Sequence, residues 1–275
     1  MIFFASYSPL KLYRKIGLSR SIGLGLLSII IISTVIGPDL VGHDPAKQDL
    51  LHARQMPNAV HLLGTDHLGR DMAARLLSGA RLSLSLGILS LVTAAFLGIS
   101  LGIIAAWFGT WTDRFLTSFA DAILALPGLL LVLILMASAP GSWWLLYIGI
   151  SLTLWVEFFR YTRQRSRIIL AHPSVDASKN LGLSNYFILT RHIFPELRNG
   201  LFTISAFGIA SAITAIAALG FVSVGIRPPM AEWGLMMTQL LPYWREAPFL
   251  ILQPIICLVL TILSLHLSVG GFHKK

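Results

Sequence analysis

The chain has 275 residues, of which 55% are hydrophobic and only 12% are charged, with a net charge of +9 and a single cysteine. Soluble domains carry about 25% charged residues, so the charge content is about half the usual value and excludes an intrinsically disordered chain. One cysteine excludes a scaffold of disulfide bonds within the chain. The basic excess is compatible with a nucleic-acid binder or a membrane protein, and its position along the chain decides between them.

Six apolar stretches recur along the chain. An α-helix needs about 20 apolar residues to cross a bilayer, and buried helices of soluble proteins do not repeat such a pattern six times. The stretches are residues 22–37, 84–108, 116–137, 144–160, 201–224 and 249–269. They predict an all-α membrane protein with six transmembrane helices that follow an N-terminal tail over residues 1–21.

Basic residues are distributed unequally among the connecting segments. If the N-terminus is cytoplasmic, fourteen of the 21 Lys and Arg lie on the inner side and seven in the outer loops 38–83 and 225–248. The positive-inside rule then places both termini and the loop 161–200 in the cytoplasm. The first stretch lacks a small-residue cleavage site, so it is interpreted as a span rather than a signal peptide. The +9 charge therefore indicates orientation and does not indicate nucleic acid.

The loop 161–200 is far longer than a connection between two spans requires. Pro173 is suited to the first turn of a helix, Gly182 to a tight turn, and Pro195 to an interruption before the fifth span. A partly apolar helix–glycine–helix segment is typical of a docking surface for a partner. It is equally typical of an amphipathic pair lying on lipid headgroups.

This loop resembles the EAA loop of ABC importer permeases. The usual form of that loop is E-A-A-x-x-x-G, followed after a gap by H-x-x-P. The matching residues, which the resemblance makes the ATPase-coupling loop, are Asp176, Ala177, Ser178, Leu181, Gly182, His192 and Pro195. Asp176 replaces the usual Glu and keeps its charge, and Ser178 replaces the second Ala and keeps its small volume.

A second segment is similar to the G-T-D-x-x-G-R-D element of the dipeptide/oligopeptide/nickel permease subfamily. It consists of Gly64, Thr65, Asp66, Gly69, Arg70 and Asp71, which the orientation places on the outer face. Residues 220–229 with Glu232-Trp233-Gly234, and Asp121 with Pro127, resemble further elements of the C-type permease subunit. The segment 268–275 departs from the L-G-D-x-L-R-D-x-L-D-P tail of that subfamily.

The resemblance implies a type I permease fold in a bacterial inner membrane, as a multi-pass subunit in the lipid bilayer. The expected partners are a second homologous permease, two ATP-binding subunits and an extracytoplasmic substrate-binding protein. The chain would form half of a path for peptides, nickel or metal chelates and would not be an enzyme. The alternatives are a secondary transporter or channel subunit without ATPase partners, and a membrane anchor with no path.

No cofactor or metal is expected on this chain, and ATP with Mg is assigned to the partner subunits. Gly64 and Gly69 have the glycine spacing of a phosphate-binding loop, but Arg70-Asp71 replaces the required Lys-Ser/Thr pair. The outer-loop histidines, His43, His52, His61 and His67, either relay metal or belong to an ordinary polar loop, and the ordinary interpretation is favoured.

Several residues inside the spans require an explanation. Asp121 either lines the translocation path or pairs with Arg114 two turns earlier, and pairing is favoured because a lone charge in a bilayer is costly. Glu157 and Arg160 are spaced for a helical ion pair. Pro127 predicts a kink. His266 either lines a path or is a packed or interface histidine, and the second interpretation is favoured.

Two further features predict how the helices pack. Small residues over 205–220, and the Gly98-x-x-x-Gly102 pair, predict close helix contacts, with the fifth span either central in the bundle or facing another subunit. Residues 66–81 alternate apolar and charged positions, which predicts an amphipathic helix at the outer interface. That helix would help to form a floor, either as a docking surface for the substrate-binding protein or as a simple lid.

Overall fold

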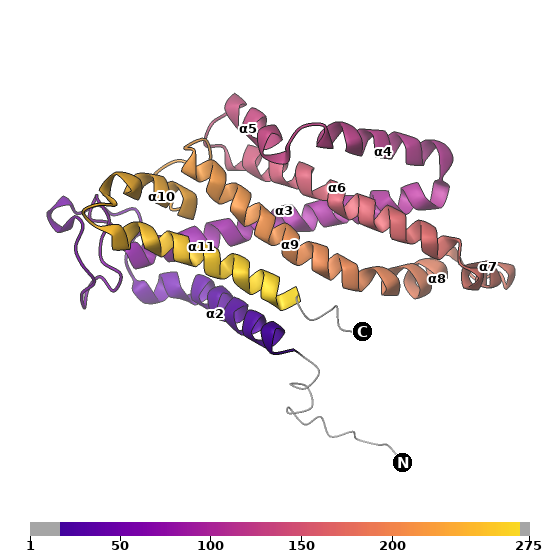
Figure 1. Ribbon diagram of the computed structural model, residues 1–275, viewed down its shortest axis with the longest axis horizontal. Helices are drawn as coiled ribbons and strands as arrows, with labels where there is room; N and C mark the ends of the chain where they lie inside the picture. The colour runs from indigo at the N-terminus through magenta and orange to yellow at the C-terminus, as the bar shows by residue number, and fades with distance from the viewer. Residues whose placement is uncertain (1–16, 270–275) are drawn as a thin grey trace, which may run out of the picture.

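The computed structural model describes residues 17–269, which fold into an elongated bundle of α-helices (Figure 1). The all-α prediction is confirmed, and the only β-contact among the described residues is an isolated bridge between Thr65 and Asp71. The helices are α2 (Leu18–Val41), α3 (Met72–Phe108), α4 (Thr110–Leu124), α5 (Gly128–Ser138), α6 (Trp143–Leu170), α7 (Pro173–Asn180), α8 (Asn185–Ile188), α9 (Phe194–Phe221), α10 (Trp233–Leu240) and α11 (Pro248–Val269). Short turns of other helix types lie at Leu50–His52, Leu189–Ile193 and Leu241–Tyr243.

Four of the described helices are long and apolar enough to cross a membrane. They are α2, α3, α11 and the continuous helical segment Asn185–Phe221. The pair α4 and α5 adds a fifth candidate if its two bent halves form one span. The predicted count of six is not reached because α6 does not qualify, although it is 28 residues long. Its second half carries Glu157 and four arginines, which lower its hydropathy.

The stretch 116–137 is two helices rather than the one predicted. The chain leaves α4 after Leu124, and α5 begins at Gly128 with its axis turned by 77°. Pro127 is the N-cap residue of α5, where its lack of an N–H costs no hydrogen bond. Its carbonyl accepts from the amides of Leu130 at 2.8 Å and Leu131 at 3.1 Å. The expected kink at Pro127 is therefore a complete helix break.

The separate amphipathic helix predicted over 66–81 is also wrong. Nothing interrupts helical geometry between residue 81 and the following apolar stretch, so α3 begins at Met72 and runs for 37 residues. Met72 and Leu76 are 0% and 6% exposed, which means that they pack against protein instead of facing headgroups. Residues 66–71 form the turn before this helix.

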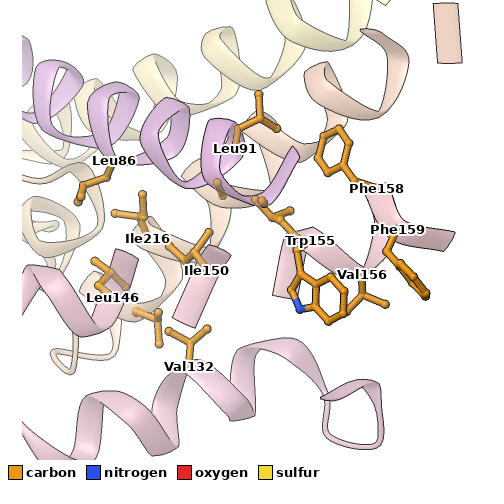
Figure 2. Close-up of a cluster of buried hydrophobic side chains, with 14 of the residues drawn as sticks. Leu86, Leu91, Val132, Leu146, Ile150, Trp155, Val156, Phe158, Phe159 and Ile216 are labelled. Atoms are coloured by element: carbon orange, nitrogen blue, oxygen red, sulfur yellow. The ribbon is translucent and has the colours of Figure 1, made fainter. Parts of the chain in front are cut away.

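The core lies between α3 and α6. Figure 2 shows Trp155, Phe158 and Phe159 of α6 among the buried side chains around α3. A Cβ atom added at Gly98 would lie 2.5 Å from the carbonyl oxygen of Trp155, and one at Gly102 would lie 2.9 Å from that of Phe159. The predicted close contact of the Gly98-x-x-x-Gly102 pair is confirmed, because no larger residue fits at this backbone distance.

The small residues of α9 place this helix at the centre of the bundle, which is one of the two predicted arrangements. It packs against α3, α6, α10 and α11, and Gly208, Ala212 and Ala217 are buried in these contacts. At the edge, α2 lies along α11, where Gly23 contacts the backbone of Leu267 and Ser268 (Figure 1). The start of α2 and the end of α11 are therefore neighbours.

Two lobes cap the opposite ends of the bundle. The α7–α8 lobe consists of residues 171–193, and the α10 lobe consists of residues 42–71 and 222–247 (Figure 1). Residues 1–16 of the predicted tail 1–21 lie outside the described residues, and α2 already begins at Leu18. The segment with the departing C-terminal sequence lies outside them from residue 270 onward.

Candidate functional site

The α7–α8 lobe holds the residues that resemble the coupling loop, and its first helix has a defined start. Pro173 occupies the first turn of α7, where the missing N–H costs nothing. The Nδ1 atom of His172 accepts a hydrogen bond from the amide of Ser174 at 3.3 Å. The side chain of His172 therefore satisfies an amide that would otherwise lack a partner in the first turn.

Gly182 ends α7 with a left-handed residue. Its φ is +73°, its amide donates to the carbonyl of Lys179 at 2.9 Å, and the amide of Leu183 donates to that of Ser178 at 3.1 Å. This pair of bonds is the Schellman motif, for which glycine is the preferred residue. No atom lies within 4 Å of a Cβ atom built at Gly182. The need for glycine therefore comes from the backbone conformation alone.

A small apolar cluster anchors the lobe to the bundle. Val175, Ile188, Ile193 and Leu197 are all 0% exposed and pack near Trp107 at the end of α3. This cluster makes the lobe part of the folded chain rather than an independent segment.

Two of the predicted coupling residues face inward. The Oγ atom of Ser178 lies 3.1 Å from Nε2 of His192, which ties α7 to the π turn before α9. Ser178 is 8% exposed and His192 is half-buried. These two residues therefore hold the shape of the lobe and present little surface of their own.

The other residues of the predicted loop are exposed. Asp176, Ala177, Gly182 and Pro195 all lie at the surface, and the Leu181 side chain is 78% exposed. Apolar side chains that protrude from a stable fold mark contact sites for proteins or membranes. The neighbouring Tyr186, 75% exposed, extends this apolar surface.

An ion-pair cluster that the sequence did not reveal lies where α4 meets α6. The Oδ2 atom of Asp113 accepts from Arg163 at 2.8 Å and from Arg167 at 2.9 Å, and its Oδ1 accepts from Nε of Arg163. Asp113 is only 6% exposed. Its partners are 50 and 54 residues away, so no local spacing pattern could have indicated the contact.

Asp121 pairs with a different residue from the one predicted. Its Oδ1 accepts from Nη2 of Arg160 at 2.6 Å, across from α4 to α6. The expected partner Arg114 is on α4, the same helix as Asp121, whereas the observed partner Arg160 is on α6. The ion pair predicted between Glu157 and Arg160 is absent from the described residues, because the Arg160 guanidinium is directed to Asp121. The predicted partner of Asp121 is therefore wrong, and the choice between a structural and a path-lining role stays a prediction.

His266 lies in a cavity of 280 Å³ between α5, α9 and α11. Small residues of α9 form one wall, including Ser211 and Ala215, and Leu129 of α5 forms part of another. The same two α9 residues also border a neighbouring cavity of 180 Å³. His266 contacts the ring of Phe207 edge-on at 4.8 Å, and its Nδ1 lies 2.8 Å from the carbonyl of Ile262. His266 is exposed within the chain and borders an open space, so its role as a packed, interface or path-lining residue stays a prediction.

The outer-face motif is a buried network in the α10 lobe rather than an exposed surface. Asp66 is 1% exposed, and its Oδ2 accepts from Nε of Arg70 at 2.7 Å. Arg75 approaches the same oxygen at 3.4 Å. Both arginines donate to Oε1 of Gln239 in α10, at 3.1 and 2.9 Å. The motif therefore holds the start of α3 against α10.

Backbone contacts explain the glycines of this motif. A Cβ atom at Gly69 would lie 1.7 Å from the carbonyl oxygen of Asp49, and one at Gly64 would lie 2.3 Å from that of Gln55. Both glycines have positive φ. Thr65 is fully buried, and its Oγ1 accepts from the amide of Gln55 at 2.9 Å. Asp71 is the N-cap residue of α3, where Oδ1 accepts from the amide of Ala74 at 2.7 Å.

A bundle of apolar helices, cavities lined by small residues and an exposed helix–glycine–helix lobe define a membrane component of a transport system. The fold is similar to that of the MetNI methionine ABC transporter in inward-facing conformations, with a TM-score of 0.57 and 15% identity over 72% of this chain and 93% of that chain. Residues 98–275 match the family model for the binding-protein-dependent transport system inner membrane component. The chain therefore belongs to this family.

Curated relatives agree with this assignment. The chain is 30% identical over 250 residues to the dipeptide transport system permease protein DppC of Alkalihalophilus pseudofirmus, covering 91% of this chain and 82% of that protein. It is 33% identical to a putative peptide transport system permease protein of Brucella suis, covering 92% and 85%. It is also 30% identical to the oligopeptide transport system permease protein OppC of Bacillus subtilis, covering 91% and 82%. The chain is thus a transport permease of the peptide family.

Proposed function

We propose that this permease is one of two unlike membrane subunits of a bacterial ATP-driven importer, and that it couples to an ATPase through residues 176–182. The exposed α7–α8 lobe is the observation that carries this proposal. Leu181 and Tyr186 protrude from a lobe whose own core is closed, so their apolar surface is available to another protein. The family membership makes an ATPase the expected protein.

The proposed topology has six spans with both termini in the cytoplasm. It counts α4 with α5 as one broken span and includes α6, whose first half is apolar. The contact between the start of α2 and the end of α11 supports it, since both ends then lie on the same side of the membrane. The inner membrane is the location proposed from the bacterial relatives.

The proposed path runs along α9 beside the break at Pro127. The cavities of 280 and 180 Å³ support this position, because small side chains and a broken helix leave room for a solute. Peptides are the proposed cargo, since relatives carry the names of dipeptide, peptide and oligopeptide permeases. Nickel or metal chelates remain the second cargo class from the sequence resemblance. A substrate-binding protein would deliver the cargo at the α10 lobe.

The proposed mechanism places all ATP chemistry on the partners. Two ATP-binding subunits would hold ATP with Mg, and their closure would move the α7–α8 lobe. Because Val175 and Leu197 are packed against the ends of the spans, movement of the lobe would tilt those helices and expose the path to alternate sides. This chain would make no covalent bond and bind no cofactor in that cycle.

Co-purification in detergent tests the proposal. The full chain is expressed together with the two ATP-binding subunits proposed as its partners and isolated with and without the substitution Gly182→Arg. Arginine at a φ of +73° disrupts the Schellman turn, so loss of the ATPase is the expected result. Gly42→Arg is the matched control, since Gly42 has a φ of +66° and open space but lies at the other end of the bundle. Equal ATPase recovery for both variants would refute coupling through this lobe.

Dependence on ATP separates this proposal from a secondary transporter or channel. Uptake of a labelled peptide in cells should stop when cellular ATP is depleted. Uptake that continues, together with isolation of the chain without an ATPase, would instead support the secondary transporter.

A further inference from the structure

Two histidines and one aspartate converge where α2 ends and α3 begins. The Nδ1 atom of His61 lies 2.8 Å from Oδ2 of Asp71, and the Nδ1 atom of His43 lies 3.4 Å from the same oxygen. One possible ligand atom from each of the three residues lies within 4.8 Å of those of the other two. The residues are 18 and 10 positions apart, so no metal-binding spacing motif reveals them in the sequence.

We propose that His43, His61 and Asp71 bind a divalent transition-metal ion of the Zn²⁺ or Ni²⁺ type. Two imidazole nitrogens and one carboxylate oxygen are a donor set that these ions accept. In a tetrahedral zinc site with bonds near 2.0–2.1 Å, neighbouring ligand atoms are about 3.3 Å apart. The distance from His43 to Asp71 already has this value, and the His61 ring needs a displacement of only about 0.5 Å to reach it.

Asp71 is oriented for this role by its own helix. Its Oδ1 atom accepts from the amide of Ala74 at 2.7 Å, which fixes the carboxylate and leaves Oδ2 facing the imidazoles. A second contact that orients a ligand is typical of protein metal sites. Asp71 is 4% exposed, whereas His61 and His43 are 20% and 35% exposed. The site is therefore rigid on the carboxylate side and accessible on the histidine side.

The surroundings favour a cation. All three residues border a cavity of 270 Å³, whose other charged lining residues are Asp44, Asp49 and Lys47. Three carboxylates against one ammonium give the cavity a negative balance. Three protein ligands leave a fourth position for water or for a group of an incoming molecule.

A metal ion here would join three segments of the α10 lobe. His43 follows Gly42 at the end of α2, Asp71 starts α3, and His61 lies in the loop between them. The site does not touch the α7–α8 lobe, so this proposal stands or fails separately from the coupling proposal.

Metal titration of the full chain tests the proposal. The protein is purified in detergent without a histidine tag, treated with a chelator, and titrated with ZnCl₂ or NiCl₂ by isothermal calorimetry. One ion per chain is expected, with a rise in the midpoint of thermal unfolding. His43→Ala and His61→Ala should each weaken binding at least about tenfold. Asp71→Ser should do the same, while the serine hydroxyl still caps α3.

His52→Ala is the matched control, because His52 is exposed in the same lobe but lies outside the cluster. It should leave the affinity unchanged. X-ray absorption of the zinc-loaded chain should show nitrogen and oxygen ligands and no sulfur. Absence of one-to-one binding, or binding that survives His43→Ala and His61→Ala, would overturn the proposal and leave a hydrogen-bonded cluster without metal. Equal losses in His52→Ala would overturn it in favour of scattered surface histidines.

Discussion

The two lobes of this permease differ in the space around their glycines and in the burial of their predicted site residues. In the α10 lobe, Gly69 packs against the backbone at a distance no side chain can occupy, and Asp66 is buried between two arginines. In the α7–α8 lobe, Gly182 has open space around it, and Leu181 points outward. The first lobe encloses its glycine and its charged motif within the chain, and the second presents its glycine turn and Leu181 at the surface. The comparison separates a glycine that tight packing requires, Gly69, from one that only the backbone conformation requires, Gly182.

The largest expected effect is that of Gly69→Ala in the α10 lobe. A Cβ atom 1.7 Å from the carbonyl of Asp49 forces the turn apart, so we expect a loss of more than about 4 kcal/mol of stability. The measurement is size-exclusion chromatography of a fluorescent fusion, in which a protein that fails to fold gives no monodisperse peak. Gly42→Ala has the same left-handed backbone without a clash and should cost about 1–2 kcal/mol. A folded Gly69→Ala protein would contradict the tight packing of this lobe.

Asp66→Asn should have the next largest effect. The change leaves Arg70 and Arg75 as buried charges without their carboxylate, at a cost of about 3–5 kcal/mol. The control is Glu246→Gln, which removes an exposed pair with Arg54 in the same lobe and should cost less than about 1 kcal/mol. Thermal unfolding in detergent distinguishes the two. Equal unfolding midpoints would show that the buried network does not support the lobe.

Glu232 should make the stability of the α10 lobe depend on pH. Burial raises the pKa of this carboxyl to about 7, although its oxygens accept from the amides of Gly234 and Leu235. The folded state then holds the proton more tightly than the unfolded state, whose pKa is near 4.5. Stability is therefore greatest at low pH and falls as pH rises toward 7, by at most about 3 kcal/mol.

Unfolding midpoints measured from pH 5 to pH 8 check this dependence. Glu232→Gln should flatten the slope, and Glu246→Gln should leave it unchanged. A slope that persists in the Glu232→Gln protein would assign the dependence to other groups.

The smallest effect on folding is expected in the α7–α8 lobe. Leu181→Ser changes a side chain that is 78% exposed, so stability should change by less than about 0.5 kcal/mol. Recovery of the ATPase in co-purification should nevertheless fall several-fold. Leu51→Ser, at a position 93% exposed in the α10 lobe, is the control and should retain the ATPase. Loss of the ATPase in both variants would remove the contrast between the lobes.

Local patterns in the sequence predicted what depends on neighbouring residues. Helical apolar stretches, the Gly98-x-x-x-Gly102 contact and the central α9 follow from hydropathy and residue size, which act along a single helix. The ion pairs between helices could not be predicted from these local patterns. Asp121 lies 39 residues from its partner Arg160, and Asp113 lies 50 residues from Arg163. Such contacts depend on how helices are placed against each other, which no local spacing encodes.

The candidate sites divide in the same way. The residues of the predicted coupling loop were recognised by their sequence motif. The inward direction of Ser178 and His192 depends on the fold of the lobe and could not be predicted from the motif. The outer-face motif was recognised in the sequence, but its burial was not foreseen, because charged residues are rarely enclosed without partners. Those partners include Gln239, which is 169 residues from Arg70.

The uninterrupted length of α3 has a mechanical consequence. Its first residues are fixed in the α10 lobe by the cap at Asp71, and Trp107 near its last turn packs against the cluster of the α7–α8 lobe. At about 1.5 Å per residue this helix is a rod of roughly 55 Å. A rotation of about 10° around one end displaces the other by roughly 10 Å, by lever geometry on that length. A single stiff rod thus connects the two lobes, so a small change in its tilt at one lobe becomes a displacement of several ångströms at the other.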